Sequence, residues 1–153
     1  MSRSTGISIT TSLLFFTVLC ATVHGENHAT EVKYIESIWI MKDQANYWSI
    51  DEITSGQLDS GFERMSNRQS NLRIQKGAGW IKLKLNTKNQ KGKKLILEVG
   101  SPIIGYLALY TPLGDQKILK KETGYTLSNQ RRDYTFSNFV FDLTPSENGI
   151  YYI

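Results

Sequence analysis

The sequence is poor in the side chains that most often carry chemistry. It has one cysteine, Cys20, and two histidines, His24 and His28. These numbers exclude an internal disulfide and a cysteine-rich zinc site, and they leave little for a Ser-His-Asp triad. The sequence also lacks an Asp-rich calcium loop and a Gly-rich phosphate loop that leads into a helix. We therefore predict no metal site, no cofactor and no catalytic residues.

The sequence also lacks a strong excess of positive or negative charge. Lysine and arginine number 18 against 14 acidic residues, which gives a net charge of +4, and many basic residues stand close to carboxylates. The densest basic cluster, Lys88 to Lys94, falls in a polar stretch that is typical of a hairpin loop, with contact to an anionic polymer or headgroup as the alternative. The carboxylates fall in predicted caps, turns and loops, whereas a glycosidase needs two of them facing one cleft. We expect neither a nucleic-acid partner nor enzymatic activity in this segment.

Long apolar runs are confined to the N-terminus. Arg3 precedes an apolar run over residues 7–20, which is short for a membrane span and lies where a secretory signal has its apolar region. The residues that follow suit the −3 and −1 positions of a cleavage site. We therefore expect a signal peptide over residues 1–25, cleaved after Gly25. An uncleaved anchor and a lipoprotein attached through Cys20 are the alternatives.

The residue pattern of the first part of the exported chain, residues 33–71, predicts one strand and one short helix. Residues 33–41 are rich in β-branched and aromatic side chains, which favours a strand. Ser49 and Glu52 have the spacing of a capping box, which predicts a short helix that stops at Gly56. Residues 57–71 are polar with scattered apolar residues and predict a loop or short irregular elements.

Alternation with a period of two dominates the rest of the chain. Ile81, Leu83 and Leu85 fall on one face and Lys82 and Lys84 on the other, which is typical of a half-buried antiparallel strand. Similar segments separated by turns follow at residues 95–99, 106–110, 116–121, 135–143 and 150–153. Strands at this spacing with almost no helix predict an all-β, jelly-roll-like antiparallel β-sandwich with one short helix near its N-terminus.

The domain organisation follows from these segments. A polar leader over residues 26–32 precedes the predicted sandwich at residues 33–153. Residues 150–153 begin an apolar strand, and the sequence stops before that strand ends. About half of the backbone hydrogen-bonding groups of such a strand would be unpaired. We expect the chain to be a fragment that is truncated in its last strand.

Three groups of residues, taken in their order and spacing, resemble a known family. They are Ser49–Ile53 with Gly79–Asn86; Leu95–Pro102 leading to Tyr106–Tyr110; and Thr123-Gly124 with Arg132, Asn138–Leu143 and Tyr151–Ile153. Over residues 33–153 they resemble the type 2 extracellular domain of bacterial seven-transmembrane receptors with diverse intracellular signalling modules.

This resemblance implies a jelly roll similar to carbohydrate-binding modules, placed before seven membrane helices and a cytoplasmic kinase, cyclase or phosphatase. It implies an exported sensing domain at the periplasmic or extracellular face of the bacterial inner membrane. The implied partners are a carbohydrate or similar small ligand and the membrane helices of the same receptor. A free secreted carbohydrate-binding or adhesin-like protein is the alternative, and a homodimer is left open.

Aromatic residues are the first candidates for ligand binding, because sandwiches often recognise sugars by stacking them on exposed rings beside polar side chains. Trp80 lies out of step with the apolar positions of its strand, and Tyr106 and Tyr110 share one strand face. The resemblance adds Arg132, where the family carries an arginine. Packing roles for the three rings and a loop-pinning role for Arg132 are the alternatives.

Overall fold

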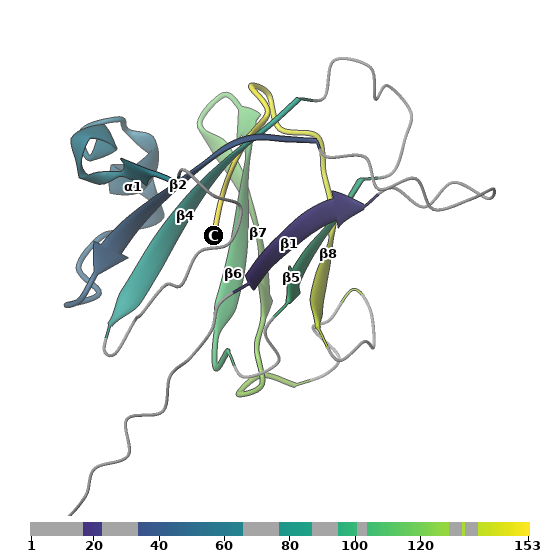
Figure 1. The fold of residues 1–153 in the computed structure, drawn as a ribbon. Coiled ribbons are helices and arrows are strands. Elements are labelled where there is room, and N and C mark those ends of the chain that lie inside the picture. The colour runs from purple at the N-terminus through teal and green to yellow at the C-terminus, as the bar shows by residue number, and fades with distance from the viewer. Residues whose placement is uncertain are drawn as a thin grey trace, which may run out of the picture.

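The computed structural model describes residues 17–22, 34–65, 77–86, 95–100, 104–128, 133 and 138–153. Within these residues the strands form two antiparallel sheets. The larger sheet has the order β3 (Glu63–Arg64), β2 (Ile35–Asp43), β4 (Ala78–Leu85), β9 (Ile150–Tyr152), β6 (Leu107–Gly114) and β7 (Lys117–Thr123). The smaller sheet has the order β1 (Thr17–Thr22), β5 (Leu95–Gly100) and β8 (Phe139–Leu143). The two sheets lie side by side in Figure 1, which confirms the predicted all-β sandwich.

The main core consists of alternate residues from both sheets. Leu83 and Tyr151 of the larger sheet and Leu97 of the smaller sheet have no exposed surface, and Leu109 and Phe141 are at most 2% exposed. Residues that alternate with them, such as those between Ile81 and Leu85, are partly exposed. Burial of each such side chain contributes about 1.5–3 kcal/mol, so the alternation fixes which face of each strand turns inward.

One short helix follows β2, as the capping box predicts. This helix, α1 (Ile50–Thr54), begins after Ser49, whose hydroxyl oxygen accepts from the amide of Glu52. The Glu52 carboxylate accepts in return from the Ser49 amide at 2.9 Å. These two hydrogen bonds satisfy amides that the first turn of a helix leaves without a partner. The bond from the Ser49 amide, and then one from the Ser49 hydroxyl, lower the pKa of the Glu52 carboxyl.

The helix and the segment after it cover part of the outer face of the larger sheet. Ile53 of α1 is fully buried and packs in a second apolar cluster with Met41, Trp80 and Tyr152. A short 3-10 helix, η1 (Asp59–Gly61), continues this cover. The segment predicted as loop or irregular structure therefore contributes cover to a second, smaller core.

The β6–β7 hairpin differs from its predicted bounds. β6 continues beyond Tyr110 through Pro112, and the turn falls at Asp115 and Gln116, both of which have positive φ. A register shift occurs between Pro112 and Gly114. Proline has no backbone N–H to donate and is tolerated in strands at such irregularities, so Pro112 lies at a bulge and the strand does not end at Tyr110 as predicted.

The N-terminal strand β1 lies within the predicted signal peptide. Its backbone pairs with β5, from Thr17 opposite Gly100 to Thr22 opposite Ile96. The structure is that of the whole chain, so this pairing does not test removal of the leader, and cleavage after Gly25 stays a prediction. The basic cluster at Lys88 to Lys94 lies outside the described residues. Among the residues that are described, no helix has the length and apolar character that a membrane crossing requires.

Tyr151 closes the turn that joins β8 to β9. Its hydroxyl accepts from the amide of Ser146 at 3.1 Å and donates to the carbonyl oxygen of Thr144 at 3.2 Å. The ring is fully buried, and this burial raises the pKa of the phenol, so the donating form persists. The last residue, Ile153, exchanges two backbone hydrogen bonds with Ile81. Tyr151 thus joins the last strand to both the core and the preceding turn.

We predict that Tyr151→Phe lowers the free energy of unfolding by about 1–3 kcal/mol, because two backbone groups lose a buried partner. Tyr47→Phe is the matched control, since Tyr47 is 79% exposed and should change stability by less than about 0.5 kcal/mol. Equilibrium chemical denaturation measures both. Equal midpoints for the two variants would show that the Tyr151 hydroxyl does not hold the turn.

Candidate functional site

A row of two tyrosine rings with a lysine at each end crosses four strands of the larger sheet on its outer face. Lys82 of β4 pairs with Tyr152 of β9, Tyr152 pairs with Tyr110 of β6, and Tyr110 pairs with Lys120 of β7. We call these four residues, together with Tyr106 and Glu122, the ring row. The order follows from register alone, because residues directly opposite one another in antiparallel strands share a face.

The cations of the ring row lie over its rings. The Lys82 ammonium is 5.9 Å from the centroid of Tyr152, and the Lys120 ammonium is 5.6 Å from that of Tyr110. Both distances fall within the range of cation–π attraction, which contributes about 0.5–1 kcal/mol at exposed sites. Lys82 is also held by Asp59 of η1 at 2.8 Å, so the cover over β4 fixes one end of the row.

Tyr106, which directly precedes β6, extends the ring row through its contacts with Lys120 and Glu122 of β7. Its ring is 50% exposed and its centroid is 5.8 Å from the Lys120 ammonium. The Tyr106 hydroxyl donates to Glu122, which also accepts from Lys120 at 2.6 Å. Partial burial and then this hydrogen bond raise the pKa of Tyr106, and the bond to Glu122 raises the pKa of Lys120. Tyr106 and Tyr110, predicted to share a face, are therefore brought together around one ammonium group.

Trp80 is next to the ring row but is covered. Its ring centroid is 5.8 Å from that of Tyr110, with 37° between the planes. The indole is only 8% exposed and its N–H donates to the Asp43 carboxylate at 3.3 Å. Asp43 also accepts from the amides of Tyr47 and Trp48. Trp80 thus lies on the predicted face, as a packing residue that anchors the loop before α1 and not as an exposed ring.

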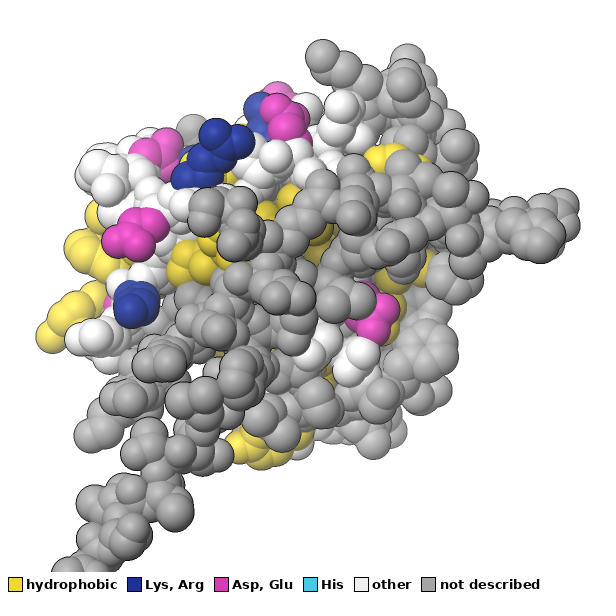
Figure 2. Space-filling model, viewed as in Figure 1, with side chains coloured by type: hydrophobic (Ala, Val, Ile, Leu, Met, Phe, Trp, Pro, Cys, Tyr) yellow, Lys and Arg dark blue, Asp and Glu magenta, His cyan; other side chains and the backbone are white. Residues whose placement is uncertain are grey.

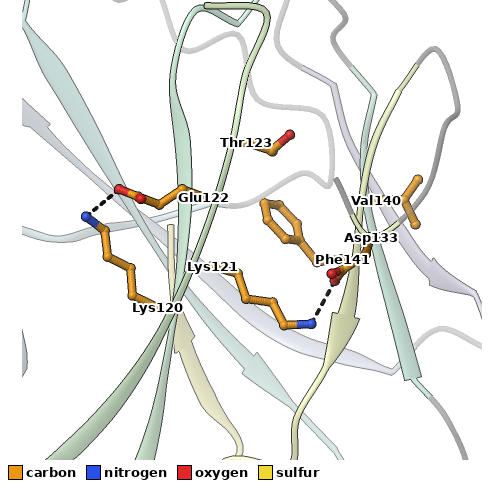
Figure 3. A pocket seen from close by; sticks show the side chains of 7 residues that line it. All are labelled: Lys120, Lys121, Glu122, Thr123, Asp133, Val140 and Phe141. Carbon is orange, nitrogen blue, oxygen red and sulfur yellow. Dashed lines mark hydrogen bonds and ion pairs between the residues drawn. The ribbon is translucent and has the colours of Figure 1, made fainter. Parts of the chain in front are cut away.

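A pocket of about 320 Å³ lies beside the opposite side of β7. β7 and β8 are the outer strands of their sheets, so the pocket sits where the two sheets are open to each other. Figure 3 shows Lys121 and Thr123 on the side of β7 that faces β8, with the Phe141 ring between the strands and the Lys120–Glu122 pair on the other side. The lining residues are Lys120, Lys121, Glu122, Thr123, Asp133, Val140 and Phe141.

Lys121 joins the two sheets across this pocket. Its ammonium donates to the Asp133 carboxylate at 2.7 Å and to the carbonyl oxygen of Asp142 at 2.9 Å. The Asp142 amide donates to the same Asp133 oxygen at 2.9 Å. Because each residue of the ion pair is about a quarter exposed, we assign the ion pair little net stability and regard it chiefly as a positioning contact.

Thr123 has a hydroxyl without a partner in the described part of the chain. The residue is 3% exposed, it lines the pocket, and Oγ1 forms no hydrogen bond there. Burying a hydroxyl in this way costs about 1–3 kcal/mol. The next residue, Gly124, has φ +142°, and a Cβ at this position would lie 2.1 Å from the carbonyl oxygen of Gly105. Gly124 therefore allows the close approach that fixes the end of β7.

The structure places three of the four predicted site residues, since Arg132 lies outside the described residues. Sequence reasoning missed Lys120 and Tyr152 of the ring row, although both follow once the strand register is known. It also missed the pocket. The doublet Lys120-Lys121 indicates only that one of two consecutive strand residues faces inward, and not what that residue meets there. No group of His, Cys, Asp and Glu among the described residues could hold a metal.

Charges of both signs are interspersed on the face seen in Figure 2. The Lys and Arg side chains that are drawn in colour lie close to Asp and Glu side chains, with neutral atoms between them. The same pairing recurs in the ring row and in the pocket, where each lysine has an acidic partner. These ion pairs place hydrogen-bond donors and acceptors next to one another in both places.

Comparison with known protein families gives a match over most of the chain. The model of the family described as 7TMR-DISM extracellular 2 matches residues 36–153, which include both the ring row and the pocket. Neither a curated protein nor a solved structure matches the chain.

Proposed function

Because the chain belongs to the 7TMR-DISM extracellular 2 family, we propose that it is the ligand-sensing domain of a bacterial membrane signalling receptor. In this proposal the domain lies on the periplasmic or extracellular side of the inner membrane and performs no catalysis itself. It binds its ligand and passes a conformational change to the membrane helices of the same receptor. The family match over residues 36–153 is the observation that supports this role.

We propose further that the ligand is a carbohydrate or a similar small molecule held on the ring row. Tyr106 offers a half-exposed ring, and Tyr110 beside it is partly exposed. A sugar ring can stack its C–H face on such rings. Lys120 and Glu122 at the same place supply a donor and an acceptor for hydroxyl groups. The support for this ligand class is the chemistry of these four side chains.

The receptor role predicts that the full-length gene encodes seven apolar segments of about 20 residues each, C-terminal to this domain. Hydropathy analysis of the complete open reading frame is the measurement. A reading frame without membrane segments would exclude the receptor role and favour a free secreted carbohydrate-binding or adhesin-like protein.

The ligand role predicts that Tyr106→Ala and Tyr110→Ala each weaken binding of a glycan identified on a glycan array. The expected loss is about 3- to 30-fold, since each variant removes a stacking ring. Tyr47→Ala is the matched control, because Tyr47 is also an exposed tyrosine but lies before α1. If all three variants bind the glycan with the affinity of the parent chain, the ring row is not the binding surface.

A further inference from the structure

We propose that the pocket between β7 and β8 is a second ligand site, which binds an uncharged, polyhydroxylated molecule of about the size of one sugar ring. The pocket has a volume of about 320 Å³, at the lower end of the roughly 300–1,000 Å³ of small-molecule sites. Such a volume suits a single ring and not an extended chain of rings.

The unpartnered hydroxyl of Thr123 is the first observation that points to a ligand. Nearly all buried polar groups in folded proteins have a hydrogen-bond partner. Thr123 is 3% exposed, and its Oγ1 has none among the described residues although it borders the pocket. A bound molecule with a polar atom at this point would supply the partner that the described residues do not.

The charges around the pocket determine the class of ligand. Lys121 is paired with Asp133, and Lys120 at the rim is paired with Glu122, so the positive and negative charges balance. An anionic ligand would meet two carboxylates, and a cationic ligand would meet two ammonium groups. A hydroxyl both donates and accepts, so it suits a site where donors and acceptors alternate over a short distance.

The remaining wall of the pocket is apolar. The Phe141 ring of β8 lies opposite Lys121 and Thr123, and Val140 lines the pocket from β8 with its side chain pointing away from β7 (Figure 3). A sugar ring or cyclic polyol has the same division, with hydroxyl groups at its rim and C–H groups on its face. Because β7 belongs to the larger sheet and β8 to the smaller one, a molecule in this pocket would contact both sheets at their open edges.

The test compares Thr123→Val with Thr123→Ser in the purified chain. The probes are D-glucose, D-galactose, D-mannose and myo-inositol, with D-galacturonate and glucose 6-phosphate as charged counterparts. Binding is measured by calorimetry and by amide chemical shifts in NMR. We expect at least one neutral probe to bind, to shift the amides of Thr123, Val140 and Phe141, and to bind at least about tenfold more weakly to Thr123→Val. Thr123→Ser, which keeps the hydroxyl, should retain binding.

Thermal unfolding separates lost binding from lost folding. Thr123→Val replaces an unpartnered buried hydroxyl with a methyl group, so its melting temperature should equal or exceed that of the parent chain. The proposal is overturned if no neutral probe binds, if the charged probes bind more tightly, or if Thr123→Val binds as well as Thr123→Ser. Should Thr123→Val fail to fold, the shifts of Val140 and Phe141 in the parent chain decide the matter.

This site shares Lys120 and Glu122 with the ring row but none of its tyrosines. Lys121 and Thr123 face the pocket on one side of β7, and Tyr106 and Tyr110 lie on the outer face of the larger sheet. Tyr110→Ala should therefore leave binding in the pocket unchanged. A glycan that is lost in Tyr110→Ala but retained in Thr123→Val would support the ring row and contradict the pocket as its site.

Discussion

The packing of the two sheets through alternate strand residues is the constraint on which the rest of this structure depends. Leu83, Leu97, Leu109 and Phe141 point inward and are almost fully buried. Because successive strand residues point to opposite faces, their neighbours must point outward. The ring row consists of such neighbours, so its cations and rings are aligned by the same register that builds the core. A slip of one residue would exchange the two faces and destroy both.

At both edges of the sandwich, side chains join elements that the strand ladders do not connect. At one edge, α1 and η1 cover part of the outer face, so that Trp80 is buried and Lys82 is fixed by Asp59. At the other edge, no strand is paired with the outer sides of β7 and β8 within the described residues, and Lys121 with Asp133 connects the two strands. An arrangement of this kind suits recognition by surface groups, as expected for an extracellular domain of the family.

Local pattern predicted most of the fold because each strand is encoded by its own alternation. The strand around Leu83, the capping box of Ser49 and Glu52, and the face shared by Tyr106 and Tyr110 could all be predicted without tertiary information. Alternation left open whether Trp80 is exposed or packed, because its cover comes from residues around Ile53 that are distant in the sequence.

The pocket could not be predicted either, for a related reason. Lys121, Asp133 and Phe141 are brought together only when the edges of two sheets meet, and neither their residue types nor their spacing forms a motif. Alternation assigns Lys121 to the inward side of its strand but does not say what it meets there. A single sequence does not show which distant strands, such as β7 and β8, lie next to each other.

Cysteine labelling along β4 tests the alternation most directly. Replacing Cys20 by serine leaves no cysteine, after which single cysteines are introduced at each position from Ile81 to Leu85 and treated with a maleimide under native conditions. Two packed sheets predict rapid labelling at positions 82 and 84, slow labelling at positions 81, 83 and 85, and equal rates in denaturant. Uniform labelling, or a pattern that repeats every three to four residues, would contradict the two-sheet core.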